Sequence, residues 1–171
     1  MFQDFFLYVA MLMELAIISL VIIFYKEFKA YTKQQSEIPQ INHEGNRMKL
    51  QALERLTMFA ERCGLANLIN RINQPGMSAS DLHFALTESI KTEFEYNISQ
   101  QVYVSPEVWN AITRLKDQNI YIIHHITASL SPAATALDLS KLIIEYSNTP
   151  NAEMNGIVLS ALQTEAKQIL N

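Results

Sequence analysis

Three polar residues stand four positions apart inside an otherwise apolar helical pattern. They are Glu93, Asn97 and Gln101, and residues at this spacing lie on one face of a helix. A row of polar groups on a buried face costs free energy unless each group is hydrogen-bonded. We therefore predict a buried polar network in which Arg55 or Arg62 pairs with Glu93. A polar strip that docks another protein is the alternative interpretation.

The histidines and the cysteine do not match a known catalytic or metal-binding spacing. His124 and His125 are adjacent, so on a helix they point about 100° apart and cannot bind one metal ion together. Cys63 ends an apolar stripe, which is typical of a buried thiol rather than a nucleophile. The sequence contains no HExxH, CxxC or glycine-rich phosphate-binding motif. We predict no enzymatic activity, no metal, no cofactor and no small-molecule substrate.

An apolar stretch of 21 residues, Phe5 to Tyr25, carries a single charged residue, Glu14. A bilayer core of about 30 Å is crossed by about 20 apolar residues in a helix. A cleaved signal peptide is the alternative, but residues 1–4 contain no lysine or arginine. The sequence therefore predicts an uncleaved transmembrane helix.

Glu14 lies close to the middle of this predicted span. An ionised carboxylate there costs about 2.5–3.5 kcal/mol on insertion scales, so the side chain must be protonated, paired or turned toward protein. We favour a role for Glu14 in assembly with another membrane protein or with a second copy of the chain. Proton- or ion-coupled activity is the alternative, although one helix cannot enclose a pathway.

Basic residues follow the span: first Lys26, Lys29 and Lys33, then Arg47 and Lys49. The positive-inside rule places the side that carries them in the cytoplasm and the N-terminus outside. The same residues favour contact with anionic membrane lipid, at about 1 kcal/mol for each basic side chain close to the surface.

The pattern predicts an all-α protein with one N-terminal transmembrane helix and a compact cytoplasmic helical domain. Residues 1–37 are expected to form the anchor and a stalk helix, residues 38–46 a linker that begins at Ile38-Pro39, and residues 47–171 the domain. Within the domain, hydrophobic periodicity indicates an amphipathic helix over residues 47–63, a short helix over 65–72 and a long helix over 78–103.

Three further helices share one start signal, a hydroxyl residue that caps the helix and a proline at its first position. The three signals are Ser105-Pro106, Ser131-Pro132 and Thr149-Pro150.

Composition argues against a nucleic-acid-binding protein and against a secreted domain built on disulfides. The net charge is −4 and the pI is about 5.5, whereas nucleic-acid-binding proteins are usually basic, so no nucleic acid is expected as a partner. A single cysteine cannot form an internal disulfide, which fits a reducing compartment.

The middle of the chain contains two distinctive segments, LQALERLTMFAERCGLANLINRI and LTESIKTEFEYNISQQVYVSPEVWNAI. Their characteristic residues are Gln51, Glu54, Arg55, Glu61, Arg62, Asn70 to Asn73, Glu93, Tyr96, Asn97, Ser99, Gln100, Gln101, Tyr103 and Trp109. In these residues the chain resembles a family of small membrane-anchored helical proteins of unknown function from Bacteroidota. The resemblance implies one N-terminal span followed by a helical domain, in the inner membrane of a bacterium. It implies no catalytic residues, and it adds no support for Glu14.

These observations together favour a membrane-tethered, non-enzymatic interaction or scaffold module on the cytoplasmic face of the inner membrane. Its expected partners are membrane lipid and another membrane protein or a second copy of itself. The alternative is an accessory subunit of a membrane complex that acts through Glu14 in the bilayer.

Overall fold

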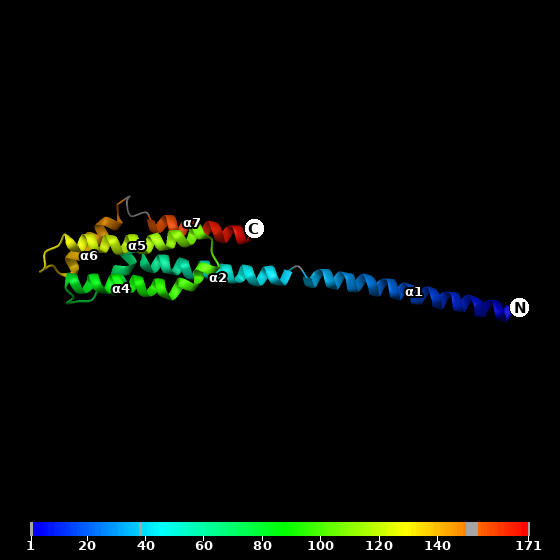
Figure 1. Cartoon of the computed structure of the whole chain (residues 1–171). Helices are drawn as coiled ribbons and strands as arrows, with labels where there is room; N and C mark the ends of the chain where they lie inside the picture. Colours follow the sequence, from blue (N-terminus) through cyan, green and yellow to red (C-terminus); the bar gives the residue numbers. More distant parts are fainter. Residues whose placement is uncertain (1, 38, 150–153, 171) are drawn as a thin grey trace. The chain divides into compact units, whose positions relative to one another are not determined.

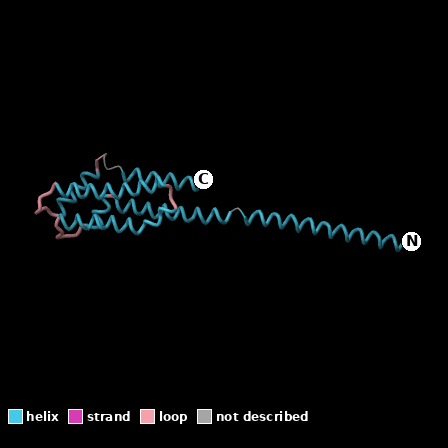
Figure 2. Tube along the Cα trace, viewed as in Figure 1, coloured by secondary structure: helices cyan, strands magenta, loops and turns pink. Residues whose placement is uncertain are grey.

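The structure, a computed structural model, describes the backbone of residues 2–37, 39–149 and 154–170, and the side chains of residues 13–30, 43–149 and 154–170. The elements in these ranges are α-helices and one 3₁₀ helix, η1 (Figure 1). No strand occurs in the described ranges, which contain helices joined by short loops (Figure 2). The prediction of an all-α fold is confirmed. The chain divides into two units, Met1–Gly45 and Asn46–Asn171.

Helix α1 (Phe2–Glu37) belongs to the first unit and ends directly before Ile38-Pro39, as the sequence predicts. Ile38 itself lies outside the described residues. Every side chain from Met13 to Phe28 is exposed. Among the residues whose side chains the structure describes, no helix has a stretch long and apolar enough to cross a membrane. The side chains of residues 5–12, which belong to the predicted span, are outside the part that the structure describes.

Helix α2 (Pro39–Cys63) differs from the prediction at its beginning. Residues 39–46 were expected to be an irregular linker, but they are helical. Proline suits the first turn of a helix because its fixed φ angle is helical and its missing N–H would have no partner there. Gly45 alone weakens a helix by only about 1 kcal/mol, which is not enough to interrupt it.

The second unit is a helical bundle in which α4 (Ala79–Asn97), α5 (Pro106–Ala128), α6 (Ala136–Ser147) and α7 (Met154–Leu170) lie side by side (Figure 1). Its core contains side chains from all of these helices and from α2 and the short α3 (Leu65–Ile72). The largest fully buried side chains include Phe59, Leu86, Ile112, Leu139 and Leu162. Each such side chain stabilises the fold by about 1.5–3 kcal/mol relative to an exposed one.

The long helix predicted over residues 78–103 is two elements. Helix α4 ends at Asn97, and η1 (Ile98–Val102) continues it as a tighter 3₁₀ helix. The apolar ridge of α4 is fully buried as far as Ile90, but Ile98 and Val102 are 47% and 76% exposed. A 3₁₀ helix turns 120° per residue instead of 100°, so the four-residue spacing no longer keeps side chains on one face.

Two similar loops precede α4 and α6 and position their first turns. In each loop a hydroxyl side chain caps the following helix and pairs with an aspartate three residues later, Ser78 with Asp81 and Thr135 with Asp138. The two loops pair as an antiparallel bridge between Ser78 and Thr135. The hydroxyl hydrogen bonds lower the pKa of both aspartates, because these bonds stabilise the charged carboxylate. The bridge holds the starts of α4 and α6 next to each other.

Helix α6 starts later than predicted. The sequence signal Ser131-Pro132 lies in the preceding loop, and Thr135 is the residue that caps the helix at Ala136. A cap with an aspartate three positions later satisfies two backbone N–H groups, whereas a hydroxyl followed by proline satisfies fewer. The predicted start at Thr149-Pro150 involves residues 150–153, which lie outside the described residues.

Candidate functional site

A groove of about 470 Å³ runs between α2 and α4. Four of the five residues predicted to form a polar network or docking strip line it, namely Arg55, Arg62, Glu93 and Asn97. The remaining lining residues are Met58, Phe59, Thr92 and Tyr96. We call this the α2–α4 groove.

Glu93 is held by arginines from two other helices. The Nε atom of Arg62 on α2 donates a hydrogen bond of 2.7 Å to Oε1 of Glu93, and Nη1 of Arg71 on α3 lies 4.0 Å from the same oxygen. The side chain of Glu93 is 20% exposed and that of Arg62 is 45% exposed, so the pair is half-buried and water screens it only partly. Of the two partners predicted for Glu93, Arg62 is therefore the observed one.

Arg55 makes a different contact. Its guanidinium carbon lies 5.0 Å from the centre of the Tyr96 ring, within the range of a cation–π interaction. Tyr96 is 72% exposed, and Met58 beside it is 55% exposed. The groove thus has an ion pair at one end and an exposed aromatic, an arginine and a methionine at the other.

The polar ladder extends over two residues, not three. Asn97 is buried, and its Nδ2 donates a 2.8 Å hydrogen bond to the backbone oxygen of Glu93. Gln101 is exposed on η1, while its neighbour Gln100 is buried and donates to Ser99 Oγ at 3.1 Å. The change from α-helix to 3₁₀ helix rotates Gln101 out of line with Glu93 and Asn97.

Phe59, which lines the groove, is the first of three aromatic rings in contact with one another. Phe59 packs edge-on against Phe94 with 6.0 Å between ring centres, and Phe94 stacks on Trp109 at 5.3 Å. Cys63 is buried in the same core, as predicted. Burial raises the pKa of its thiol to about 12, with a further contribution from the charge of Glu93. The thiol therefore stays protonated and unreactive at neutral pH.

Replacing Glu93 by alanine is expected to destabilise the domain by about 1–2 kcal/mol, because Arg62 and Arg71 lose a shared acceptor that water replaces only in part. Glu88→Ala is the matched control, since Glu88 pairs with Lys91 in an exposed i,i+3 ion pair worth about 0–1 kcal/mol. Thermal unfolding of both variants measures the difference. Equal melting temperatures for the two variants would mean that the Glu93 pair adds nothing beyond a surface contact.

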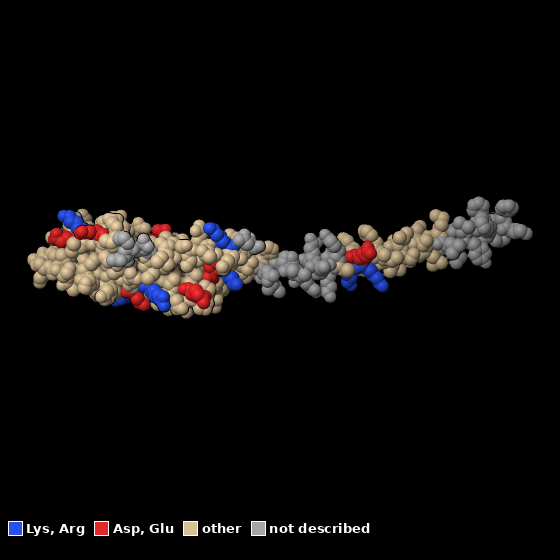
Figure 3. Space-filling model, turned by 90° about the horizontal axis from the view of Figure 1, so that it is seen from above, with Lys and Arg blue, Asp and Glu red and all other residues tan. Residues whose placement is uncertain are grey.

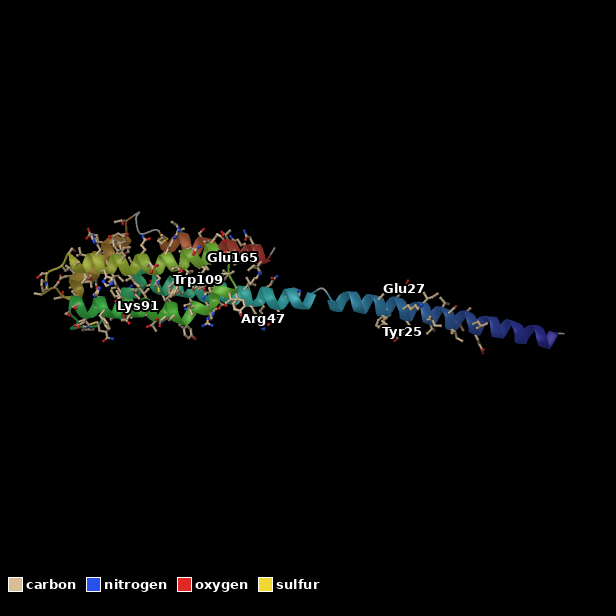
Figure 4. All side chains as sticks on the ribbon, viewed as in Figure 1. Tyr25, Glu27, Arg47, Lys91, Trp109 and Glu165 are labelled. Atoms are coloured by element: carbon tan, nitrogen blue, oxygen red, sulfur yellow. The ribbon has the colours of Figure 1, made fainter. Side chains whose placement is uncertain are left out.

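The basic residues predicted to face lipid occupy both units. Lys26 and Lys29 are exposed on α1, and Arg47 and Lys49 are exposed on α2 in the second unit. The side chain of Lys33 lies outside the described residues. In the described part of α1, the charged side chains visible in this view gather beside a stretch of uncharged surface (Figure 3). The side chains of Tyr25 and Glu27 project from different sides of α1 (Figure 4).

The sequence analysis missed one contact that fixes α7. Glu165 on α7 accepts a 2.9 Å hydrogen bond from the backbone N–H of Ser105 and a second, short hydrogen bond from the Ser105 hydroxyl. A carboxylate at the first turn of α5 also interacts favourably with the helix dipole. The capping serine was visible in the sequence, but its distant acidic partner was not.

The described elements define an all-helical protein whose second unit is a bundle with an exposed groove. The chain belongs to a family of unknown function, DUF7935, whose sequence profile matches residues 3–169. Comparison with curated proteins gave no match, and comparison with solved structures gave none either. The resemblance found in the sequence is thus confirmed as membership of a family of unknown function, whereas a Bacteroidota origin and membrane anchoring remain predictions.

Proposed function

We propose that this protein is a membrane-tethered, non-enzymatic interaction module that displays its helical domain on the cytoplasmic face of a bacterial inner membrane. One observation carries the proposal. Eleven large hydrophobic side chains between Met13 and Phe28 are 52–72% exposed on α1. Monomeric soluble proteins rarely expose contiguous apolar patches larger than a few hundred Å². A surface of this kind needs an apolar environment.

Lipid suits this helix better than a protein partner does. Seven of the eight residues from Ile17 to Phe24 are large and apolar, and they point in every direction around the helix axis. A partner helix covers one face, whereas acyl chains surround a helix completely. The predicted span Phe5–Tyr25 has the length to cross a bilayer core, and Lys26 and Lys29 follow it on the side that the positive-inside rule assigns to the cytoplasm.

The α2–α4 groove is the surface that we propose for interaction with a protein partner. Its exposed end combines Tyr96, Arg55 and Met58, residue types enriched at protein interfaces. Arg62 and Glu93 hold one another across the groove, so its walls are already ordered before a partner binds. Ordered walls reduce the entropy lost on binding.

A single added thiol can test on which side of the membrane the helical domain lies. Gln163 is exposed on α7, so Gln163→Cys adds an accessible thiol to a chain whose native Cys63 is buried and unreactive. In a bacterial host, a membrane-impermeant maleimide is expected to label this variant only after the cells are permeabilised. The wild-type chain serves as the control and stays unlabelled. Labelling of Gln163→Cys in intact cells would place the domain outside and refute this part of the proposal.

A second candidate function rests on Glu14, whose side chain is exposed on α1 between Met13 and Leu15. In a bilayer this carboxyl would seek a hydrogen-bonding partner on a second helix. We expect Glu14→Leu to weaken association within the membrane by about 1–2 kcal/mol and Glu14→Gln to retain most of it. Crosslinking in membranes measures the association. Equal crosslinking of wild type and Glu14→Leu would remove this candidate.

A further inference from the structure

The fold brings together two histidines that are 41 positions apart in the sequence. His83 on α4 and His124 on α5 face one another with 2.7 Å between Nε2 of His83 and Nδ1 of His124. Their ring centres lie 4.5 Å apart at an angle of 61°. His83 is half-buried and His124 is exposed, so the pair lies at the surface of the α4–α5 contact. No metal site was predicted, because neither the spacing of the histidines nor any known metal-binding motif in the sequence places His83 next to His124.

We propose that His83 and His124 form a two-imidazole site for a divalent transition-metal ion such as Zn²⁺, which would link α4 to α5. Neutral imidazole nitrogen is a preferred ligand of zinc, copper and nickel, whereas calcium and magnesium prefer oxygen. The two nitrogens come from different helices and face one another at 2.7 Å, so a small rotation of the rings lets both bind one ion.

The distance between the two nitrogens must increase only slightly to fit a zinc ion. Zinc–nitrogen bonds of about 2.0–2.1 Å at a tetrahedral angle put two ligand nitrogens about 3.3–3.4 Å apart. The rings must therefore separate by roughly 0.6 Å from their hydrogen-bonded position. Rotation of the exposed His124 side chain can supply this, because exposed side chains change rotamer readily.

One local effect favours binding of a metal ion at this pair and another opposes it. Burial, and then the charges of His124 and Lys91, lower the pKa of His83, so this imidazole is neutral at neutral pH and its lone pair is available. Lys91 also repels a bound cation, although the exposed Glu88 partly offsets its charge. Both effects together indicate a site of modest affinity.

The coordination shell would remain partly open. Within the described residues no group of three or more histidine, cysteine, aspartate or glutamate side chains could hold one ion. Water would occupy the remaining positions, as it does in zinc sites that keep an open position. The ion would thus crosslink α4 and α5 and could accept a further ligand.

Calorimetric titration of the full-length chain with Zn²⁺, in detergent and without a polyhistidine tag, tests the proposal. Wild type is expected to bind one ion per chain, and His83→Gln and His124→Gln to bind about tenfold or more weakly. His125→Gln is the matched control, because His125 is also exposed but stacks on Tyr121 instead. It is expected to bind as wild type does.

Thermal unfolding adds a readout that does not depend on the folding of the variants. Zn²⁺ should raise the melting temperature of wild type, since a ligand that binds only the folded state stabilises it, and Mg²⁺ should not. Two results would overturn the proposal: wild type that takes up no Zn²⁺ at millimolar concentration, or a loss of binding in His125→Gln as large as in His83→Gln. In either case the two imidazoles would form only a hydrogen-bonded pair.

Discussion

A chain in which Leu15 and Ile22 are both replaced by lysine is expected to lose its association with membranes. The two residues lie on one side of α1, seven positions apart, and are 59% and 52% exposed, so lysine displaces no packed neighbour in the described structure. Leu15 lies at the middle of the span, where a lysine costs about 2.5–3.5 kcal/mol, and Ile22 lies nearer its end, where a second lysine adds a smaller cost. Neither position is three or four residues from Glu14, so neither new charge can pair with it along the helix.

The matched control places the same two charges on the domain. Leu137 on α6 and Ile157 on α7 are 58% and 59% exposed, and Leu137→Lys with Ile157→Lys is expected to leave the chain in the membrane fraction. Sedimentation of membranes followed by immunoblotting compares the two variants. If both double variants stayed with membranes equally, α1 would not be the anchor.

Phe59→Ala is expected to destabilise the domain by about 3–5 kcal/mol, the usual range for deletion of a buried aromatic side chain. Phe59 is 1% exposed and packs against Phe94, which in turn stacks on Trp109. The cavity would open at the centre of the contact between α2 and α4. With a melting temperature that falls by roughly 3–5 °C per kcal/mol in a domain of this size, the drop should be about 9–25 °C.

Met58→Ala provides the comparison for this prediction. Met58 precedes Phe59 on the same helix but is exposed, and a surface substitution usually changes stability by less than about 0.5 kcal/mol. Thermal unfolding of the full-length chain, followed by circular dichroism, measures both variants. A small effect of Phe59→Ala would show that α2 is not part of the folded core.

Local patterns in the sequence were enough to predict much of the helical architecture. The amphipathic stripe that includes Leu56, Phe59 and Cys63 indicates a helix that packs against a core, and these side chains are buried. Ser105 with Pro106 marks the start of α5 correctly, because capping depends on neighbours within one turn. Signals of this kind act over a few residues and can be read directly from the chain.

Contacts between distant residues could not be predicted in the same way. Periodicity puts Arg55 and Arg62 on equal terms as partners of Glu93, and only the packing of α2 against α4 selects Arg62. The pairing of His83 with His124 requires the antiparallel contact of α4 and α5. Gln101 was placed wrongly because the change to a 3₁₀ helix at Ile98 has no strong local signal.

Extraction of bacterial membranes with alkaline carbonate tests the central proposal most directly. This treatment removes peripheral proteins and leaves chains that are held by a hydrophobic span. We predict that the full-length wild-type chain remains in the membrane pellet, because the apolar surface of α1 is buried among acyl chains. Recovery of the full-length chain in the soluble fraction before carbonate, or its release by carbonate, would contradict the proposal that α1 anchors the domain in the bilayer.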